Sequence, residues 1–363
     1  MTRDRYIQFV LFSLHSFQDI PKGLSDEDWI WIYNESVRQS IVGITYQGVR
    51  LKLCSTNPPK ELEAKWKEQY DKIEAANKVI TKACCELSYY FKMYGFDNAI
   101  LKGLSKAILY PNPMARTPGD IDIWLDGGQK KVLGFIEKNG IIGQKGYHHF
   151  HTTAEIVGYP EIPLEIHFRP SSGSFSPFKN RIIQKVLEEE LHEIEYYKIK
   201  DGNIYTPSKL FAVVSELIHI RRHFVGGGIG LRHMLDLYML LKQCPLAHRK
   251  YLVKRLGLLS FTGAVSYVMC ECMGMDNAKY FPIPSNEKSG KKLWNEIFLG
   301  GNFGRYAPRQ EHGFFVRGML REYRTLRLFS LCPSEFIWWE IQLWSLFVRT
   351  IPKRIMKRSW SLR

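Results

Sequence analysis

Hydrophobic residues in the first part of the chain recur every three or four positions, which is the spacing of amphipathic helices. Ser25 followed by three acidic residues predicts a helix start, because a serine caps the first turn and acids suit the helix dipole. A long second helix is expected from residue 60 to about residue 94, after a proline-containing break. The side chains expected to face inward are Trp29, Ile32, Val37 and Ile41 in the first helix and Leu62, Trp66, Tyr70, Ile73, Ala76 and Ile80 in the second.

The pattern changes at Phe96, where polar and apolar residues begin to alternate as they do in β-strands. Gly158-Tyr159-Pro160 predicts the turn of a hairpin. Helical spacing returns from about residue 207, around a glycine-rich loop. The predicted strands are 98–101, 119–125, 148–157 and 162–168, and the helices that accompany them are 129–139, 208–223 and 231–241.

These elements predict an α+β fold, with a small β-sheet core at residues 95–205 between helical regions at 1–94 and 206–363. Hydrophobic residues make up 45% of the 363 residues, enough for a sizeable core. Seven cysteines without CxxC spacing indicate reduced, buried thiols rather than a zinc ribbon or a disulfide framework. Polar residues interrupt the first 20 positions, so no signal peptide is predicted and a cytoplasmic location is expected.

Asp120 and Asp122 are separated by one residue in a predicted strand, so their carboxylates project from the same face. Two like charges held this close repel each other unless a cation neutralises them. Oxygen ligands suit Mg²⁺ or Mn²⁺, which bind a few carboxylates together with substrate phosphates. Taken alone, the pair is also compatible with a solvated strand edge.

Two flanking segments strengthen the metal interpretation. Upstream, Lys102-Gly103 and Ser105 lie between an apolar strand and a helix start, a junction at which backbone N–H groups approach a phosphate. A surface turn explains a lone Lys-Gly equally well. Downstream, alternation places Glu165 and His167 on one strand face. Glu165 completes a three-carboxylate site if its strand pairs beside the strand of the two aspartates.

The chain resembles the nucleotidyltransferase superfamily, which has a DNA-polymerase-β-like fold, in an ordered set of motifs: Lys102-Gly103, then Arg116-Thr-Pro-Gly-Asp120-Ile-Asp122-Ile, then Leu-Glu165-Ile-His167. It is similar above all to uncharacterised bacterial members, over most of residues 1–245. The resemblance implies a mixed β-sheet with flanking helices, binding of an NTP such as ATP with Mg²⁺, and transfer of a nucleotidyl group to an acceptor. Whether the acceptor is a small molecule, a sugar or a protein stays open.

The resemblance further implies that Asp120, Asp122 and Glu165 are the catalytic carboxylates and hold one or two Mg²⁺ ions, with Glu165 as a base if it is not a ligand. Leu104 stands where the superfamily has a second small residue, and we therefore expect side-chain charge to replace some backbone contacts to the nucleotide. The alternative is a catalytically silent relative that binds a nucleotide or a partner. Phosphate contacts are expected at Lys102, Gly103, Ser105 and Arg116.

Five further residues are expected on the substrate side: His167, His219, His223, Arg232 and Asp236. His219 and His223 share a helix face, where packing or exposure to solvent is the simpler interpretation. Arg232 and Asp236, also four apart, form an intrahelical ion pair by default. A zinc site is disfavoured because strand alternation separates His148 from its neighbours. The histidines considered for it are His148, His149, His151 and His167.

The formal net charge of +15 favours phosphate-bearing or anionic partners, and nucleic acid is the less expected of these. Residues 336–348 are strongly apolar but too few to span a membrane, and a basic segment follows them. A helix packed on the domain with a solvated basic tail is expected. Peripheral contact with an anionic membrane, at the inner face, is the alternative. The basic residues are Lys353, Arg354, Lys357, Arg358 and Arg363.

Overall fold

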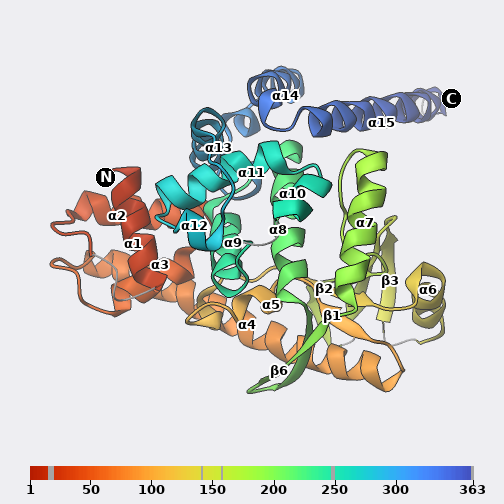
Figure 1. Cartoon of the computed structure of the whole chain (residues 1–363), viewed down its shortest axis with the longest axis horizontal. Coiled ribbons are helices and arrows are strands. Elements are labelled where there is room, and N and C mark those ends of the chain that lie inside the picture. Colours follow the sequence, from red (N-terminus) through yellow and green to blue (C-terminus); the bar gives the residue numbers. More distant parts are fainter. Residues whose placement is uncertain (15–19, 140–141, 157, 247–249, 361–363) are drawn as a thin grey trace.

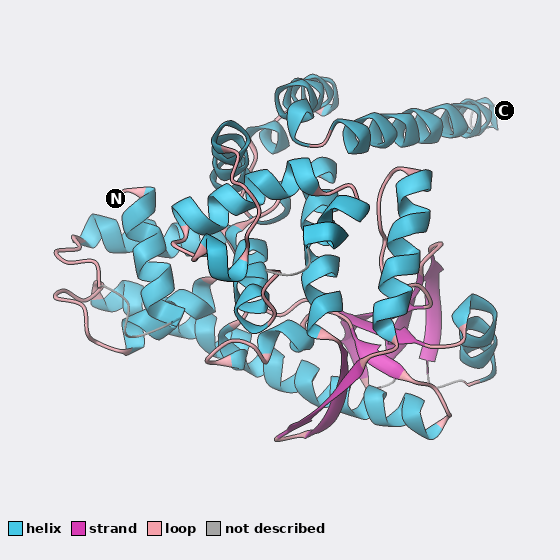
Figure 2. Ribbon diagram, viewed as in Figure 1, coloured by secondary structure: helices cyan, strands magenta, loops and turns pink. Residues whose placement is uncertain are grey.

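The computed structural model describes residues 1–14, 20–139, 142–156, 158–246 and 250–360, and it is mainly helical around one five-stranded sheet (Figures 1 and 2). The longer helices are α1 (Arg3–Leu14), α2 (Asp26–Arg38), α3 (Val42–Arg50), α4 (Lys60–Met93), α6 (Gly128–Lys138), α7 (Pro177–Leu191), α8 (Lys209–Gly226), α9 (Leu231–Gln243), α11 (Leu259–Tyr267), α13 (Glu287–Gly300), α14 (Phe314–Leu328) and α15 (Pro333–Trp360). The short helices are α5 (Leu104–Ala107), α10 (Lys250–Arg255) and α12 (Asn277–Tyr280).

The sheet is mixed, as expected. Its strands are β1 (Asn98–Ile100), β2 (Ile121–Leu125), β3 (Ile142–Tyr147), β4 (His151–Ile156) and β5 (Tyr159–His167), in the order β1-β2-β5-β4-β3. Strands β2 and β5 are parallel, and the other neighbours are antiparallel. A separate hairpin consists of β6 (Ile194–Ile199) and β7 (Gly202–Pro207). The α+β prediction and the β4–β5 hairpin are confirmed, whereas β3, the β6–β7 hairpin and α7 were not predicted.

Two hydrophobic cores organise the described part of the chain. The first joins α1–α3 to the helices from α7 onward, and the second lies between the sheet, α6 and the later half of α4. Helix α4 contributes Trp66 and Tyr70 to the first core and Leu87 and Phe91 to the second. The division of the chain at residues 94 and 205 stays a prediction, and the helical regions before and after the sheet share one core.

Helix α2 begins as the sequence predicted but ends earlier. The Asp28 amide donates to Ser25 Oγ and the Ser25 amide to Asp28 Oδ2, each at 3.2 Å, which is a capping box. Trp29 is buried as expected. The expectation for Val37 was wrong, because this side chain is 38% exposed. The helix stops at Arg38, so that Ile41 is buried at the start of α3 instead.

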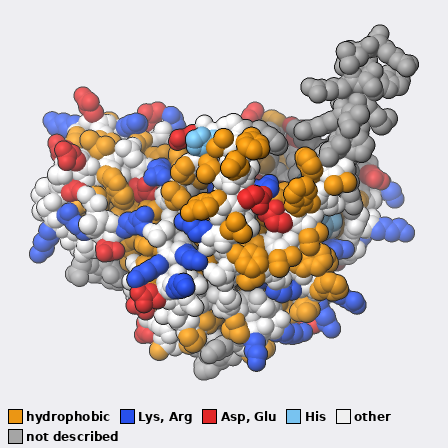
Figure 3. Space-filling view, turned by 90° about the horizontal axis from the view of Figure 1, so that it is seen from above, with side chains coloured by type: hydrophobic (Ala, Val, Ile, Leu, Met, Phe, Trp, Pro, Cys, Tyr) orange, Lys and Arg blue, Asp and Glu red, His pale blue; other side chains and the backbone are white. Residues whose placement is uncertain are grey.

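Among its described side chains, those up to Val348, the C-terminal helix packs on the domain through its first turns. Phe336 is buried, and the Glu335 carboxylate accepts hydrogen bonds from Ser174 Oγ and the Phe175 amide. From Ile341 onward most apolar side chains are exposed, so the expected packing of the whole apolar run was wrong. Hydrophobic side chains gather on this face in Figure 3, which views the α14–α15 side of the molecule. Among the described residues, no helix combines the length and apolarity that crossing a bilayer requires.

Candidate active site

Three carboxylates meet where β2 and β5 lie side by side. In the parallel register of these strands, Asp122 lies opposite Glu165. Asp120 immediately precedes β2, two residues from Asp122, and therefore lies on the same side of the strand. Ligand oxygens of Asp120, Asp122 and Glu165 all lie within 4.8 Å of one another. The predicted pairing of the two strands is confirmed, and it brings the three carboxylates together.

Asp122 is the buried member of this group and has two cationic or polar partners on one oxygen. Lys102 Nζ and His167 Nε2 each lie 2.9 Å from Asp122 Oδ1. His167 Nε2 is also 3.4 Å from Glu165 Oε2. His167 is almost fully buried and lies behind the carboxylates rather than in the open part of the site. Lys102 therefore acts as the internal counter-ion of the carboxylate group.

The two aspartates have opposite pKa shifts. Burial raises the pKa of Asp122, but Lys102 and His167 outweigh it and hold the pKa well below its usual range. Asp120 is exposed as a residue, but partial desolvation of its carboxyl group and the neighbouring Asp122 raise the pKa of Asp120. Burial lowers the pKa of His167, yet hydrogen bonding to Asp122 and Glu165 raises it overall. Asp120 is consequently less well compensated by nearby cations than Asp122.

The Lys102-Gly103 turn holds the lysine beside the carboxylates. The Leu101 amide donates to the Asp122 carbonyl at 2.9 Å, which fixes the turn to β2. Gly103 has φ +65°, a left-handed conformation that favours glycine. Helix α5 follows with four residues and places Lys106 toward the cavity. The Ser105 hydroxyl is buried without a hydrogen-bond partner in the described structure.

Helices α8 and α9 face the carboxylates across a cavity of about 280 Å³. We call the side with Asp120, Asp122 and Glu165 the sheet wall. The opposite side, the helical wall, consists of His219, Arg222 and His223 from α8 and Arg232, His233 and Asp236 from α9. The volume of the cavity is near the lower end of the range for small-molecule sites, which is about 300–1,000 Å³. The cavity is strongly polar on both sides.

Buried ion pairs hold the helical wall together. Arg116 binds Asp236 through two hydrogen bonds, Nε to Oδ1 at 2.8 Å and Nη2 to Oδ2 at 2.7 Å. Tyr110 donates its hydroxyl to Asp236 Oδ1 at 2.8 Å. Lys106 pairs with Glu216, and both are buried. Burial raises the pKa of Asp236, but Arg116 and Lys106 outweigh it and hold the pKa well below its usual range.

The histidines of the helical wall are held in their neutral form. The rings of His219 and His223 are 4.2 Å apart, and the ring of His233 is 5.7 Å from that of His219. Burial lowers the pKa of His223 to about 4, with a further contribution from Lys102. Burial also lowers the pKa of His219 and His233 well below the usual range. These rings therefore offer hydrogen-bonding nitrogens without positive charge at neutral pH.

Most of the residues expected from sequence line this cavity. The lining includes Lys102, Gly103, Arg116, Asp120, Asp122, Glu165, His219, His223, Arg232 and Asp236, whereas Ser105 and His167 do not line it. Sequence reasoning missed Lys106, Arg222, His233 and Phe303. Lys106 lies in the short helix that follows Lys102-Gly103, and its place near that turn could have indicated it. Phe303 lies far along the chain from the other lining residues, and no local pattern indicates it.

Two expectations for side chains around the cavity were wrong. Asp236 pairs with Arg116 rather than with Arg232, whose Nη1 donates to the Thr117 carbonyl at 3.3 Å. His148 and His149 lie in the turn between β3 and β4 and not in a strand, so strand alternation does not apply to them. The ring of His148 is 4.7 Å from that of His151. His151, by contrast, begins β4 and faces Glu165.

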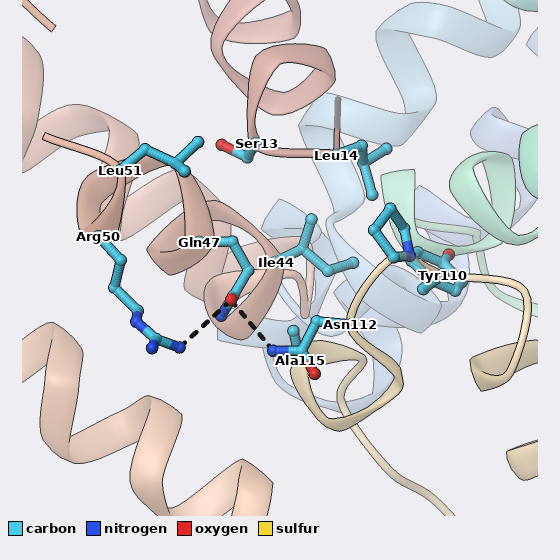
Figure 4. Close-up of a pocket in the computed structure, with 10 residues that line it drawn as sticks. Ser13, Leu14, Ile44, Gln47, Arg50, Leu51, Tyr110, Asn112 and Ala115 are labelled. Carbon is cyan, nitrogen blue, oxygen red and sulfur yellow. Dashed lines mark hydrogen bonds between the residues drawn. The ribbon is translucent and has the colours of Figure 1, made fainter. Parts of the chain in front are cut away.

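A second cavity, of about 370 Å³, lies among α1, α3 and the loop after Tyr110 (Figure 4). Gln47 Oε1 accepts hydrogen bonds there from Asn112 Nδ2 at 3.0 Å and from Arg50 Nη1 at 3.5 Å. Among its described lining residues there is no carboxylate or histidine. Its lining therefore offers no carboxylate or imidazole ligand for a metal, and the candidate chemistry is assigned to the cavity between the two walls.

A family model described as uncharacterised nucleotidyltransferase matches residues 25–273, which contain all the residues of both walls. The chain belongs to this family. The predicted resemblance to the nucleotidyltransferase superfamily is thereby confirmed. Among solved structures, the chain is similar to an antigenic nucleotidyltransferase-like protein from Paracoccidioides brasiliensis, with 10% identity, a TM-score of 0.35, and coverage of 58% of this chain and 97% of that chain. The comparison with curated proteins gave no match.

Proposed function

We propose that the protein is a metal-dependent nucleotidyltransferase that moves a nucleotidyl group from an NTP to a hydroxyl-bearing acceptor. The observation that carries this proposal is the convergence of Asp120, Asp122 and Glu165 beside Lys102 in one cavity. Membership of the family supports the reaction class. The acceptor, whether a small molecule, a sugar or a protein, is not specified by these residues.

The carboxylate group fits a hard divalent cation. Asp120 has a raised pKa because nearby negative charge adds to burial, which is the electrostatic situation that a bound cation relieves. Asp120, Asp122 and Glu165 would hold Mg²⁺ or Mn²⁺. When bound, the ion would neutralise charge on the nucleotide phosphates.

The chain's own residues would position the substrates around this group. Lys102, at the centre of the carboxylates, would turn toward a phosphate when the carboxylates take up a cation. Arg222 and Arg232 line the cavity from the helical wall and would contact the remaining phosphate charge. Arg116 already binds Asp236 with two bonds, and we assign it to holding the helical wall rather than to gripping phosphate.

In the proposed reaction, the acceptor hydroxyl oxygen attacks the α-phosphorus of the NTP and pyrophosphate leaves. Glu165 would accept the hydroxyl proton when Asp120 and Asp122 alone hold the cation, since its carboxylate is 25% exposed and faces the cavity. Neutral His219 and His223 lie on the opposite wall and would accept or donate hydrogen bonds to the acceptor.

Thermal unfolding with each of the four NTPs, with and without Mg²⁺, tests this function. The wild type should be stabilised by one or more nucleotides only when the metal is present, because ligands that bind only the folded state raise its stability. Asp120→Ala/Asp122→Ala should abolish that shift, and the exposed His192→Ala variant should retain it. A folded wild type that responds to no nucleotide would instead support a catalytically silent relative.

A second proposal concerns the face of α14 and α15, where we expect peripheral contact with an anionic membrane. Phe315 is 77% exposed and Trp344 is 64% exposed, and the sequence beyond residue 348 is basic. Sedimentation with vesicles tests this contact. Binding to anionic vesicles should exceed binding to zwitterionic ones and should fall in a Phe315→Ser/Trp344→Ser variant. Equal sedimentation with both vesicle types, or none, would contradict it.

A further inference from the structure

Two histidines extend the sheet wall beyond its three carboxylates. His151 and His167 lie directly opposite each other in the antiparallel β4–β5 pair. His151 is only 5% exposed, and the rings of the two histidines are 5.1 Å apart. Glu165 lies between them, with Oε2 at 3.2 Å from His151 Nδ1 and 3.4 Å from His167 Nε2. Two nitrogens and one carboxylate therefore converge beside the aspartates.

The ring nitrogens of His151 lack hydrogen-bond partners among the described residues. Both of its ring nitrogens are buried and form no hydrogen bond within the described structure, although Nδ1 is close to Glu165. Buried polar atoms normally find a partner, because an unpaired one has lost its hydrogen bonds to water without replacing them. His151 lines the cavity, so a ligand that enters the cavity can reach it. A cation between the two rings and Glu165 would satisfy all three groups at once.

We infer that His151, Glu165 and His167 form a second metal site, which prefers a borderline divalent cation such as Zn²⁺ or Co²⁺. Ligand atoms of these three residues lie within 4.8 Å of one another. Imidazole nitrogen suits such ions, whereas Mg²⁺ prefers oxygen ligands. The inference rests on the proposed function only through Glu165, which the two sites share.

Each of the two sites contains a residue that the other lacks, so substitutions can distinguish them. Asp120 belongs to the carboxylate site and is not among the donors of the nitrogen-containing site. His151 belongs to the nitrogen-containing site alone. Replacing one or the other residue therefore separates the sites, whereas replacing Glu165 affects both. His192, an exposed residue at the end of α7, is a control for the general effect of removing a histidine.

The test is a Co²⁺ titration of the full chain, stripped of metal and kept in a large excess of Mg²⁺, followed by visible absorption. The wild type, Asp120→Ala and His192→Ala should bind Co²⁺ with affinities within a few-fold of one another. His151→Ala should weaken binding by about 100-fold or more, since even groups that only orient ligands contribute about 10–100-fold. His167→Gln, which keeps a polar side chain, should also weaken Co²⁺ binding. This variant replaces His151→Ala in the test if His151→Ala does not fold.

Three outcomes would overturn this inference: no Co²⁺ binding by the wild type under excess Mg²⁺, binding that survives in His151→Ala, or an equal loss in Asp120→Ala. Each is distinguishable from failure of the proposed function, because stabilisation by nucleotide and Mg²⁺ is measured without Co²⁺. A wild type that shows the nucleotide shift but binds no Co²⁺ would keep the transferase proposal and remove the second site.

Discussion

Both walls of the cavity are rich in charged side chains, but their carboxylates differ in how far they are exposed. On the sheet wall, the Glu165 carboxylate is 25% exposed, and Lys102 is the lysine shared by the carboxylate group. Against the helical wall, the carboxylates of Asp236 and Glu216 are only 3% and 1% exposed, and each is paired with a cation. The comparison indicates that the carboxylates at the helical wall serve to build the cavity, whereas the sheet wall buries only Asp122, beside Lys102, and leaves Asp120 and Glu165 available to a ligand.

Breaking the helical wall should produce the largest effect on stability. Asp236→Ala leaves Arg116 buried without its partner, and such a loss typically costs about 3–5 kcal/mol. Urea unfolding should show this decrease in the free energy of unfolding. Asp120→Ala is the matched change on the sheet wall, and it should cost less than about 1 kcal/mol because it also removes repulsion from Asp122. Equal losses in both variants would contradict the proposed division of roles.

For the rate of nucleotidyl transfer, substitutions on the sheet wall should have a larger effect than those on the helical wall. Asp122→Asn removes a proposed ligand while keeping the shape of the side chain, and the transfer rate should fall by about 100-fold or more. Labelled nucleotide transferred to the acceptor, once the acceptor is identified, measures this loss. A variant with an unchanged rate would show that the carboxylate group is not the catalytic centre.

The histidines of the helical wall should make stability depend on pH. The pKa of His223 is about 4 in the folded protein against an ordinary value of 6.5, so the unfolded chain binds the proton more readily between these values. The free energy of unfolding should therefore fall as the pH drops from 6.5 toward 4, by roughly 1–3 kcal/mol for one such histidine. His223→Gln should reduce this slope, whereas His192→Gln should not. Identical slopes in the wild type and His223→Gln would refute the assignment.

The smallest expected effect concerns the internal counter-ion. Lys102→Met removes the ammonium group that competes with a cation for Asp122 while keeping most of the side-chain volume. Binding of Mn²⁺ alone, followed by the loss of its free-ion paramagnetic resonance signal, should strengthen by a few-fold. Affinity for the NTP with metal should weaken, because a phosphate contact is lost. Weaker binding of Mn²⁺ alone would mean that Lys102 supports the cation site instead of competing for it.

The residues of the sheet wall could be predicted because the sequence patterns that indicate them lie within short segments. Asp120 and Asp122 are two residues apart, and Glu165 lies in a strand with clear alternation. The helical wall depends on tertiary contacts that no short window contains. Arg116 and Asp236 are separated by 120 positions. Arg232 lies only four positions before Asp236 and was therefore expected, incorrectly, to be its partner.

The fold shows the same division between local and distant information. Long amphipathic helices and strongly alternating strands were predicted, as α4 and β2 illustrate. The β6–β7 hairpin was missed because two aromatic residues in succession, Tyr196 and Tyr197, interrupt the alternation of polar and apolar residues in β6. At the C-terminus, apolar composition predicted burial, but α15 extends past the surface that its first turns cover.

The most direct test of the sheet wall as a cation site is a crystal structure with Mn²⁺ and a non-hydrolysable NTP analogue, analysed by anomalous scattering from manganese. We expect an anomalous peak in contact with the carboxylate oxygens of Asp120 and Asp122, with Lys102 turned toward the nucleotide phosphates. No peak at these carboxylates, with Lys102 still bound to Asp122 in the presence of the nucleotide, would contradict the central claim.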